Sequence, residues 1–99
     1  MKRDQALQIL ADHKDELARR GVKSIAIFGS TARDEAGARS DIDILVDVDH
    51  DTKPFGIFAF LGLKDHLEEI LGCRVDLVTP DSLHPGMRDG ILREAIRAA

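Results

Sequence analysis

The segment from residue 41 to residue 49 (DIDILVDVD) constrains the fold most, because its side chains alternate in character. Isoleucine or valine occupies each even position, and aspartate occupies every odd position except Leu45. Successive side chains of a β-strand point to opposite faces of a sheet, so this pattern predicts a strand with one apolar and one acidic face. The apolar face needs a second layer to cover it.

Two other apolar runs predict the remaining strands of that sheet. Residues 22–28 (VKSIAIF) are short and rich in β-branched side chains, and residues 74–79 (RVDLVT) end just before Pro80. Apolar residues at helical spacing predict helices over residues 4–20, 54–71 and 85–98, with a shorter helix at residues 31–36. The order α-β-α-β-α-β-α predicts an α/β fold with a three-stranded mixed sheet and about four helices.

Three of these helices carry expectations about burial. The first is expected to bury one face, made of Ala6, Ile9, Leu10, His13 and Leu17. The last is expected to turn inward Met87, Ile91, Leu92, Ala95 and Ile96. The helix of residues 54–71, the third, is apolar nearly all round through Phe55, Phe58, Phe60 and their neighbours. Burial against the sheet explains part of this pattern, and an exposed apolar patch for a partner or a second copy is the alternative.

Length and composition limit the classes of function. The chain has 99 residues, enough for one domain over residues 1–99 and too few for separate catalytic and substrate domains. Its formal charge of −4 argues against direct nucleic-acid binding, because no basic excess is available to neutralise phosphates. One cysteine, no visible targeting segment and an apolar run limited to residues 54–63 predict a cytoplasmic protein without a membrane span.

One group of residues indicates a chemical function. Gly29 and Ser30 follow a predicted strand, and Asp41 and Asp43 lie at the start of the next one. Glycine has no side chain, so phosphate groups can approach the backbone closely at that position. Ser30 is expected to begin a helix, whose unbonded N–H groups and positive dipole end attract an anion. This order predicts a phosphate-binding turn of the kind that a nucleoside triphosphate needs.

The two aspartates predict a metal site. Asp41 and Asp43 are two residues apart, so both carboxylates leave the same strand face, with Cα atoms about 7 Å apart. Carboxylates at this spacing can hold divalent metals such as Mg²⁺ for phosphoryl transfer. Asp76, the acid inside the third predicted strand, is the candidate third ligand. Asp47 and Asp49 lie too far along their strand and are assigned to solvent or to a partner.

Each of these residues also has a simpler interpretation. Alternating aspartates often form only a solvated strand face, Gly-Ser often forms only a turn, and Asp76 could be an acid exposed at a sheet edge. Arg33, one turn into the short helix, could bind phosphate, or it could pair with Glu35 or another nearby acid. The fixed spacing, placed across strand, turn, helix and strand, favours the functional interpretation.

The residues around this group resemble a known family. The segments FGSTAR (residues 28–33) and SDIDILV (residues 40–46) are similar to the signature of the DNA polymerase β-like nucleotidyltransferase superfamily. Segments within residues 62–72, 75–80 and 91–95 resemble its minimal nucleotidyltransferase (MNT) branch, so the resemblance covers nearly the whole chain. It implies the small nucleotidyltransferase fold.

This resemblance also implies an activity, a metal and a partner. The activity is transfer of AMP from ATP, with Mg²⁺ in a two-metal site held by three catalytic carboxylates, those of Asp41, Asp43 and Asp76. The nucleotide would be held by Gly29, Ser30, Thr31 and Arg33. Many members are antitoxins that silence a small HEPN ribonuclease toxin by attaching AMP to a tyrosine. The implied partner is therefore a HEPN-type toxin encoded by the adjacent gene.

One position departs from the pattern of the family. Relatives commonly have Arg-Gly-Glu-Ala where this chain has RDEA at residues 33–36, and the extra charge of Asp34 would oppose a bound triphosphate. The alternative function is a non-catalytic antitoxin that neutralises its partner by occlusion. A third possibility, a small-molecule nucleotidyltransferase of the antibiotic-modifying sort, would need a second region for the acceptor, and no residues remain to build one.

Overall fold

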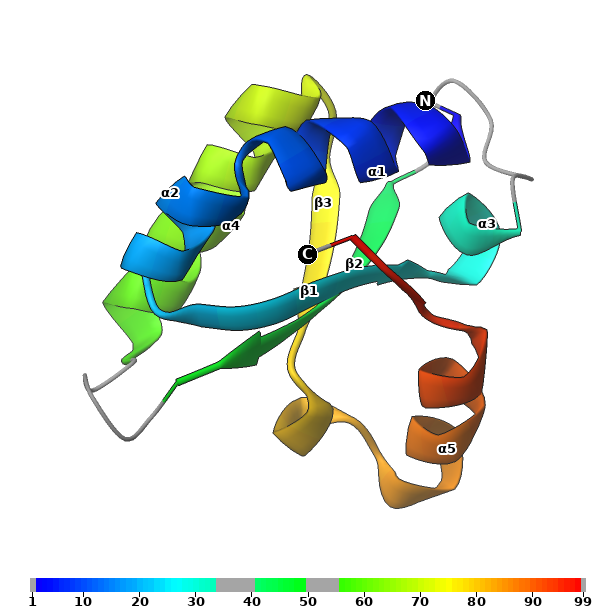
Figure 1. Ribbon diagram of the computed structural model, residues 1–99. Coiled ribbons are helices and arrows are strands. Elements are labelled where there is room, and N and C mark those ends of the chain that lie inside the picture. Colours follow the sequence, from blue (N-terminus) through cyan, green and yellow to red (C-terminus); the bar gives the residue numbers. More distant parts are fainter. Residues whose placement is uncertain (1, 34–40, 50–55, 99) are drawn as a thin grey trace.

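One sheet with helices on both sides organises the chain, which the computed structural model describes over residues 2–33, 41–49 and 56–98 (Figure 1). The elements in chain order are α1 (Arg3–Asp12), α2 (Lys14–Arg19), β1 (Val22–Phe28), α3 (Gly29–Ala32), β2 (Ile42–Val48), α4 (Ile57–Leu71), β3 (Val75–Val78), the 3₁₀ turn η1 (Pro80–Ser82), α5 (Pro85–Glu94) and β4 (Ile96–Arg97). Helices α1, α2 and α4 cover one face of the sheet, and α5 lies on the other side.

The sheet contains four strands in the order β3-β2-β1-β4. Strand β1 pairs antiparallel with β2 and β4, whereas β2 pairs parallel with β3. The predicted α/β class and mixed sheet are confirmed, and the predicted number of strands is corrected from three to four. The fourth strand lies inside the stretch that helical spacing assigns to the last helix.

The end of α5 explains this difference. Ala95 has an extended backbone (φ −63°, ψ 137°), so the helix stops at Glu94 and the chain runs alongside β1. Ile96 lies opposite Ile27, and the Ala98 backbone N–H donates to the Ile25 carbonyl oxygen at 2.8 Å. These bonds satisfy backbone groups on the outer edge of β1, which helical spacing in the sequence cannot reveal.

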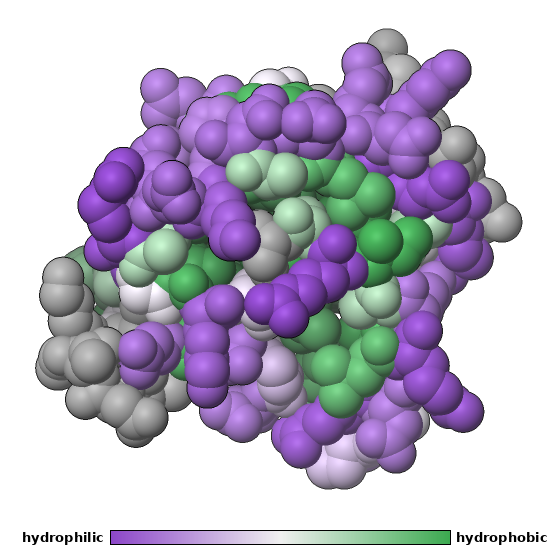
Figure 2. All heavy atoms as spheres, in the orientation of Figure 1, coloured by the Kyte–Doolittle hydropathy of each residue, from purple (hydrophilic) through white to green (hydrophobic). Residues whose placement is uncertain are grey.

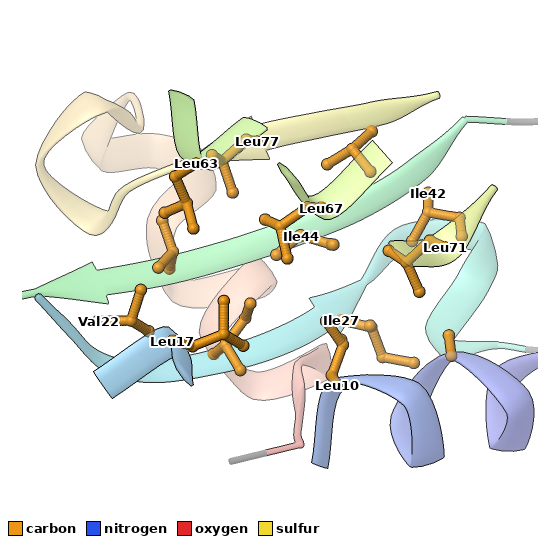
Figure 3. Close-up of a cluster of buried hydrophobic side chains, with 14 of the residues drawn as sticks. Leu10, Leu17, Val22, Ile27, Ile42, Ile44, Leu63, Leu67, Leu71 and Leu77 are labelled. Carbon is orange, nitrogen blue, oxygen red and sulfur yellow. The ribbon is translucent and has the colours of Figure 1, made fainter. Parts of the chain in front are cut away.

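The main core lies between the sheet and the three helices α1, α2 and α4. The even-numbered side chains of β2 are all buried there, as the alternating pattern predicts. They pack with leucines of the covering helices, shown in Figure 3, which include Leu10, Leu17, Leu63 and Leu67. The acidic face of β2 therefore points away from this core, toward the side of α5.

The predicted first helix is interrupted at His13, between α1 and α2. The His13 imidazole Nδ1 lies 2.8 Å from the Ile9 carbonyl oxygen. The His13 backbone N–H donates to the carbonyl oxygen of Leu10, three residues earlier. This tighter bonding ends α1 after 10 residues, within what the pattern treats as one continuous helix. Ala6, Leu10 and Leu17 are buried as predicted, whereas Ile9 and His13 are half-buried.

Helix α4 is buried at one end and exposed at the other. Leu63, Leu67 and Leu71 enter the core, and the helix ends before Gly72, which adopts the left-handed conformation (φ 70°) that glycine favours at this position. Its first turns expose Ile57, Leu61 and Phe58, and Phe58 is 87% exposed. An exposed apolar strip, rather than complete burial, therefore describes the start of this helix. Pro54 and Phe55 lie outside the described residues.

Helix α5 contains no buried residue. The predicted burial of Met87 and Leu92 is wrong, because both are exposed, and Ile91, Ala95 and Ile96 are only half-buried. The physical reason is that, within the part of the chain that the structure describes, no further layer covers α5 on its outer side. Figure 2 shows apolar atoms reaching the surface between α1 and α5 on an otherwise hydrophilic face. Within residues 2–33, 41–49 and 56–98, none of the helices has the length and apolarity needed to cross a membrane.

Candidate active site

Three strands bring the predicted site residues to one corner of the sheet. Asp43 lies opposite Phe28, the last residue of β1, and also opposite Asp76 of β3. Val75 and Leu77 on either side of Asp76 are buried, so Asp76 points to the same side of the sheet as Asp43. Neighbouring strands run about 4.8 Å apart, which places these two carboxylates within reach of one ion.

Gly29, directly after β1, makes the closest approach to this carboxylate pair. Its backbone is left-handed (φ 64°), a conformation that side chains disfavour. A Cβ added at this position would overlap Oδ2 of Asp43 and lie 3.1 Å from its Cγ. Both the backbone conformation and the lack of space therefore require glycine where β1 passes into α3.

The carboxyl of Asp43 has an unusual electrostatic environment. Burial raises its pKa above the ordinary value of 3.8, and the neighbouring carboxylates of Asp76 and Asp41 raise the pKa further. The Arg33 guanidinium acts in the opposite direction, and Glu94 adds to the increase in the pKa. A cation bound among these carboxylates would relieve this repulsion.

The donor chemistry of this corner suits Mg²⁺. In the described part of the chain, no three His, Cys, Asp or Glu side chains already converge as a ready-made metal site. Mg²⁺, however, usually takes only one or two carboxylates and completes its shell with phosphate oxygens and water. The pair formed by Asp43 and Asp76 meets that requirement, and Asp41, exposed two residues earlier on the same face, flanks it.

The predicted phosphate turn lies beside these carboxylates. Helix α3 (Gly29–Ala32) is a single turn in which Ser30 is half-buried. Thr31 is fully buried, and its Oγ1 has no hydrogen-bond partner among the described residues. Ser30 is therefore the more accessible of these two residues of the turn.

Arg33, which follows α3, forms an ion pair with Glu94 at the end of α5. The sequence left open whether Arg33 meets phosphate or a nearby acid, and the structure shows an acid 61 residues away along the chain. Glu35 lies outside the described residues. Sequence reasoning assigned Glu94 no role, because no local pattern connects the two residues. Asp47, by contrast, is exposed and lies opposite Ser24, away from the Asp43–Asp76 pair, as expected.

Comparison with known proteins decides the family. The family model described as a nucleotidyltransferase domain matches residues 10–98. The chain belongs to the nucleotidyltransferase domain family. The predicted family and the predicted enzyme class, a nucleotidyltransferase, are thereby confirmed.

Similar proteins agree with this assignment. The protein adenylyltransferase MntA of Thermococcus cleftensis is 45% identical over 89 residues, which cover 89% of this nucleotidyltransferase and 87% of the relative. A solved structure of a protein provisionally described as a minimal nucleotidyltransferase has a TM-score of 0.79 and 37% identity, and the match covers 97% of this chain and 95% of the other.

A more distant structure shares the fold. The MNT antitoxin in complex with the tri-AMPylated HEPN toxin of Shewanella oneidensis matches with a TM-score of 0.63 at 22% identity. The match covers 94% of this nucleotidyltransferase and 71% of the other chain. At this identity, the likeness supports the small nucleotidyltransferase fold.

Proposed function

We propose that this nucleotidyltransferase transfers AMP from ATP to a hydroxyl group of a partner protein. The acceptor is a tyrosine of a HEPN-type toxin that is encoded by the adjacent gene, and the chain acts as a cytoplasmic antitoxin against this toxin. Two comparisons support this proposal: a relative with 45% identity is named a protein adenylyltransferase, and a protein of the same fold is an antitoxin in complex with an AMPylated HEPN toxin.

The observation that carries the proposal is the pairing of Asp43 with Asp76 beside Gly29. Two acids on neighbouring strands provide carboxylates for a metal, and the adjacent glycine leaves the backbone open to phosphates. A solvated strand face would not need a left-handed glycine packed against one of its carboxylates. This combination favours phosphoryl chemistry over the simpler interpretation.

The residues of the site have distinct roles in this reaction. Asp41, Asp43 and Asp76 would hold Mg²⁺, which supplies charge neutralisation for the attacking and leaving oxygens. Gly29, Ser30, Thr31 and Arg33 would hold the triphosphate through backbone N–H groups, a hydroxyl and a guanidinium.

The reaction forms one bond and breaks one. The acceptor oxygen attacks the α-phosphorus, the bond from that phosphorus to the pyrophosphate oxygen breaks, and pyrophosphate leaves. Asp76 helps to remove the proton from the acceptor hydroxyl, and the proton passes to solvent. The contribution of the protein is positioning and charge stabilisation rather than covalent catalysis.

Matched aspartate variants test this proposal. The Asp41→Asn variant, incubated with labelled ATP, Mg²⁺ and the protein encoded by the adjacent gene, should lose AMP transfer by about 100-fold or more, the scale of removing one electrostatic element of an active site. Asp47→Asn removes an exposed acid from the same strand and should transfer AMP as the wild type does. Equal transfer by Asp41→Asn and the wild type would overturn the assignment.

The exposed apolar strip of α4, made of Ile57, Phe58 and Leu61, favours a second candidate. In this alternative, the domain neutralises the same HEPN-type partner by occlusion, and catalysis is secondary. The variant Phe58→Ser, compared with Asp41→Asn, separates the two functions. Neutralisation that is lost in Phe58→Ser but kept in Asp41→Asn would support occlusion, and the opposite pattern would support AMP transfer.

The same strip could also join two copies of this chain, which the oligomeric state of Phe58→Ser would reveal.

A further inference from the structure

We infer that Glu94 is a positioning residue for nucleotide binding, because it holds the guanidinium of Arg33 beside the phosphate turn. This inference rests on the proposed function, in which Arg33 contacts the triphosphate. It adds a residue from the far end of the chain to the site, and it gives α5 and the two-residue strand β4 a role in that site.

The pairing of β4 with β1 brings Glu94 to the turn. Arg97 lies opposite Ala26, and Ile96 lies opposite Ile27. Strand β1 ends at Phe28 and β4 begins at Ile96, so the start of α3 and the end of α5 lie at the same end of this antiparallel pairing. Glu94 is also the last residue of α5, so the turn from helix to strand sets its place.

Packing alone does not explain the position of Glu94. Helix α5 has no buried residue, so its placement depends less on a core than that of α1 or α4. The Arg33 side chain is 50% exposed and that of Glu94 is 31% exposed, so their ion pair joins α5 to the phosphate turn at the surface. Exposed pairs of this type contribute little to global stability, and their removal should leave the fold intact.

Both partners lie near the carboxylates of the site. Arg33 follows the single turn α3, whose first residue, Gly29, lies against the carboxyl of Asp43, and Glu94 forms its ion pair with Arg33 there. A guanidinium has five N–H donors in a planar fork, and one Arg can therefore bond a carboxylate and a phosphate from different N–H groups. Holding the side chain in advance reduces the conformational entropy lost when the triphosphate binds.

The first experiment measures binding of Mg·ATP by calorimetry and, separately, KM for ATP and kcat for AMP transfer. We expect Glu94→Ala to weaken Mg·ATP binding and to raise KM by about three- to fivefold, the size that an exposed ion pair can transmit, with little change in kcat. Asp89→Asn removes an exposed acid from the same helix and should bind Mg·ATP as the wild type does. An unchanged affinity in Glu94→Ala would overturn the inference.

A double-mutant cycle provides a readout that a merely structural role would not move. In the Arg33→Ala background, Glu94→Ala should cause little further loss of Mg·ATP affinity, because the residue through which it acts is gone. An equal loss in both backgrounds would contradict the inference. Thermal unfolding of each variant verifies that the fold is retained.

The same measurements separate this inference from the proposed function. Wild-type protein that binds Mg·ATP with the expected dependence on Glu94, yet transfers no AMP to the partner, would contradict the proposed function alone. Transfer of AMP with an affinity that does not depend on Glu94 would contradict the inference alone. Wild-type protein that binds no Mg·ATP would contradict both.

Discussion

Asp43 and Asp76 lie opposite each other in the parallel pairing of β2 with β3, at the corner of the sheet where β1 passes into α3. Burial of Asp43 and the proximity of Asp76 raise the pKa of Asp43. The folded protein therefore holds two carboxylates in a place where they repel each other. This arrangement lowers the stability of the folded protein in the absence of a cation. It favours the binding of a cation when one is available.

The first prediction concerns the stability of the metal-free protein. Because the pKa of Asp43 is raised on folding, the folded state binds this proton more tightly than the unfolded state. The contribution of Asp43 to stability should therefore fall as the pH rises from the ordinary value of 3.8 through the higher pKa of the folded state. Asp43→Asn should be more stable than the wild type at neutral pH, as measured by urea unfolding in the presence of EDTA.

The control for this prediction is Asp47→Asn, an exposed acid of the same strand outside the carboxylate pair. Its stability should follow the wild-type dependence on pH. A lower stability of Asp43→Asn than of the wild type at neutral pH would show that Asp43 contributes favourable contacts that outweigh the repulsion.

The second prediction concerns metal and nucleotide. Mg²⁺ with ATP should raise the melting temperature of the wild type, because a ligand at 100 times its Kd stabilises the folded state by about 2.7 kcal/mol. Asp76→Asn should lose most of this increase, and EDTA should remove it in the wild type. The measurement is a thermal shift at several Mg²⁺ concentrations. An increase of the same size in Asp76→Asn would exclude this residue from the metal site.

The third prediction concerns Gly29. Gly29→Ala should destabilise the protein by about 1–2 kcal/mol from the left-handed backbone alone. The overlap of the new Cβ with the carboxylate of Asp43 should add to this loss. Urea unfolding measures the effect, and the double variant Gly29→Ala with Asp43→Ala should recover the part that comes from the overlap.

A second glycine provides the matched control for that measurement. Gly62 lies within α4, and a Cβ added there meets nothing within 4 Å. Gly62→Ala should therefore stabilise the protein by about 0.5–1 kcal/mol, since alanine is the better helix former. If both substitutions changed the stability equally, the special role of Gly29 would be refuted.

The fourth prediction concerns Glu68 of α4, which secures the start of β3. The Val75 backbone N–H donates to its Oε2 at 3.0 Å, and Lys64 Nζ lies 3.4 Å from its Oε1. The hydrogen bond from Val75, followed by the one from Lys64, lowers the pKa of Glu68 below its ordinary value of 4.5. This stabilisation is present above pH 4.5 and is lost as the pH falls through the lower pKa of the folded state.

Glu68→Gln tests this link between α4 and the strand that carries Asp76. The variant should be less stable than the wild type at neutral pH, and the difference should shrink as the pH falls below 4.5. Glu69→Gln, an exposed neighbour on the same helix, should leave the dependence on pH unchanged. A stability difference between Glu68→Gln and the wild type that did not vary with pH would contradict this account.

The sequence by itself determined the features that depend on local periodicity. The alternation in residues 41–49 predicts β2 and its buried face, because the period of two belongs to the strand itself. The positions of Asp41 and Asp43 follow from the same pattern, and that of Gly29 follows from the apolar run of residues 22–28 that precedes it. The predicted end of the third helix at residue 71 is also correct, since the left-handed cap that Gly72 forms there is a local property.

Only the tertiary structure decided the features that depend on distant pairing. Strand β4 exists because the edge of β1 accepts its backbone, and the ion pair of Arg33 with Glu94 joins residues 61 positions apart. The exposure of Phe58 and Met87 depends on which faces remain without a covering layer. Local spacing records how apolar a segment is, whereas burial and pairing depend on what the rest of the chain places against it.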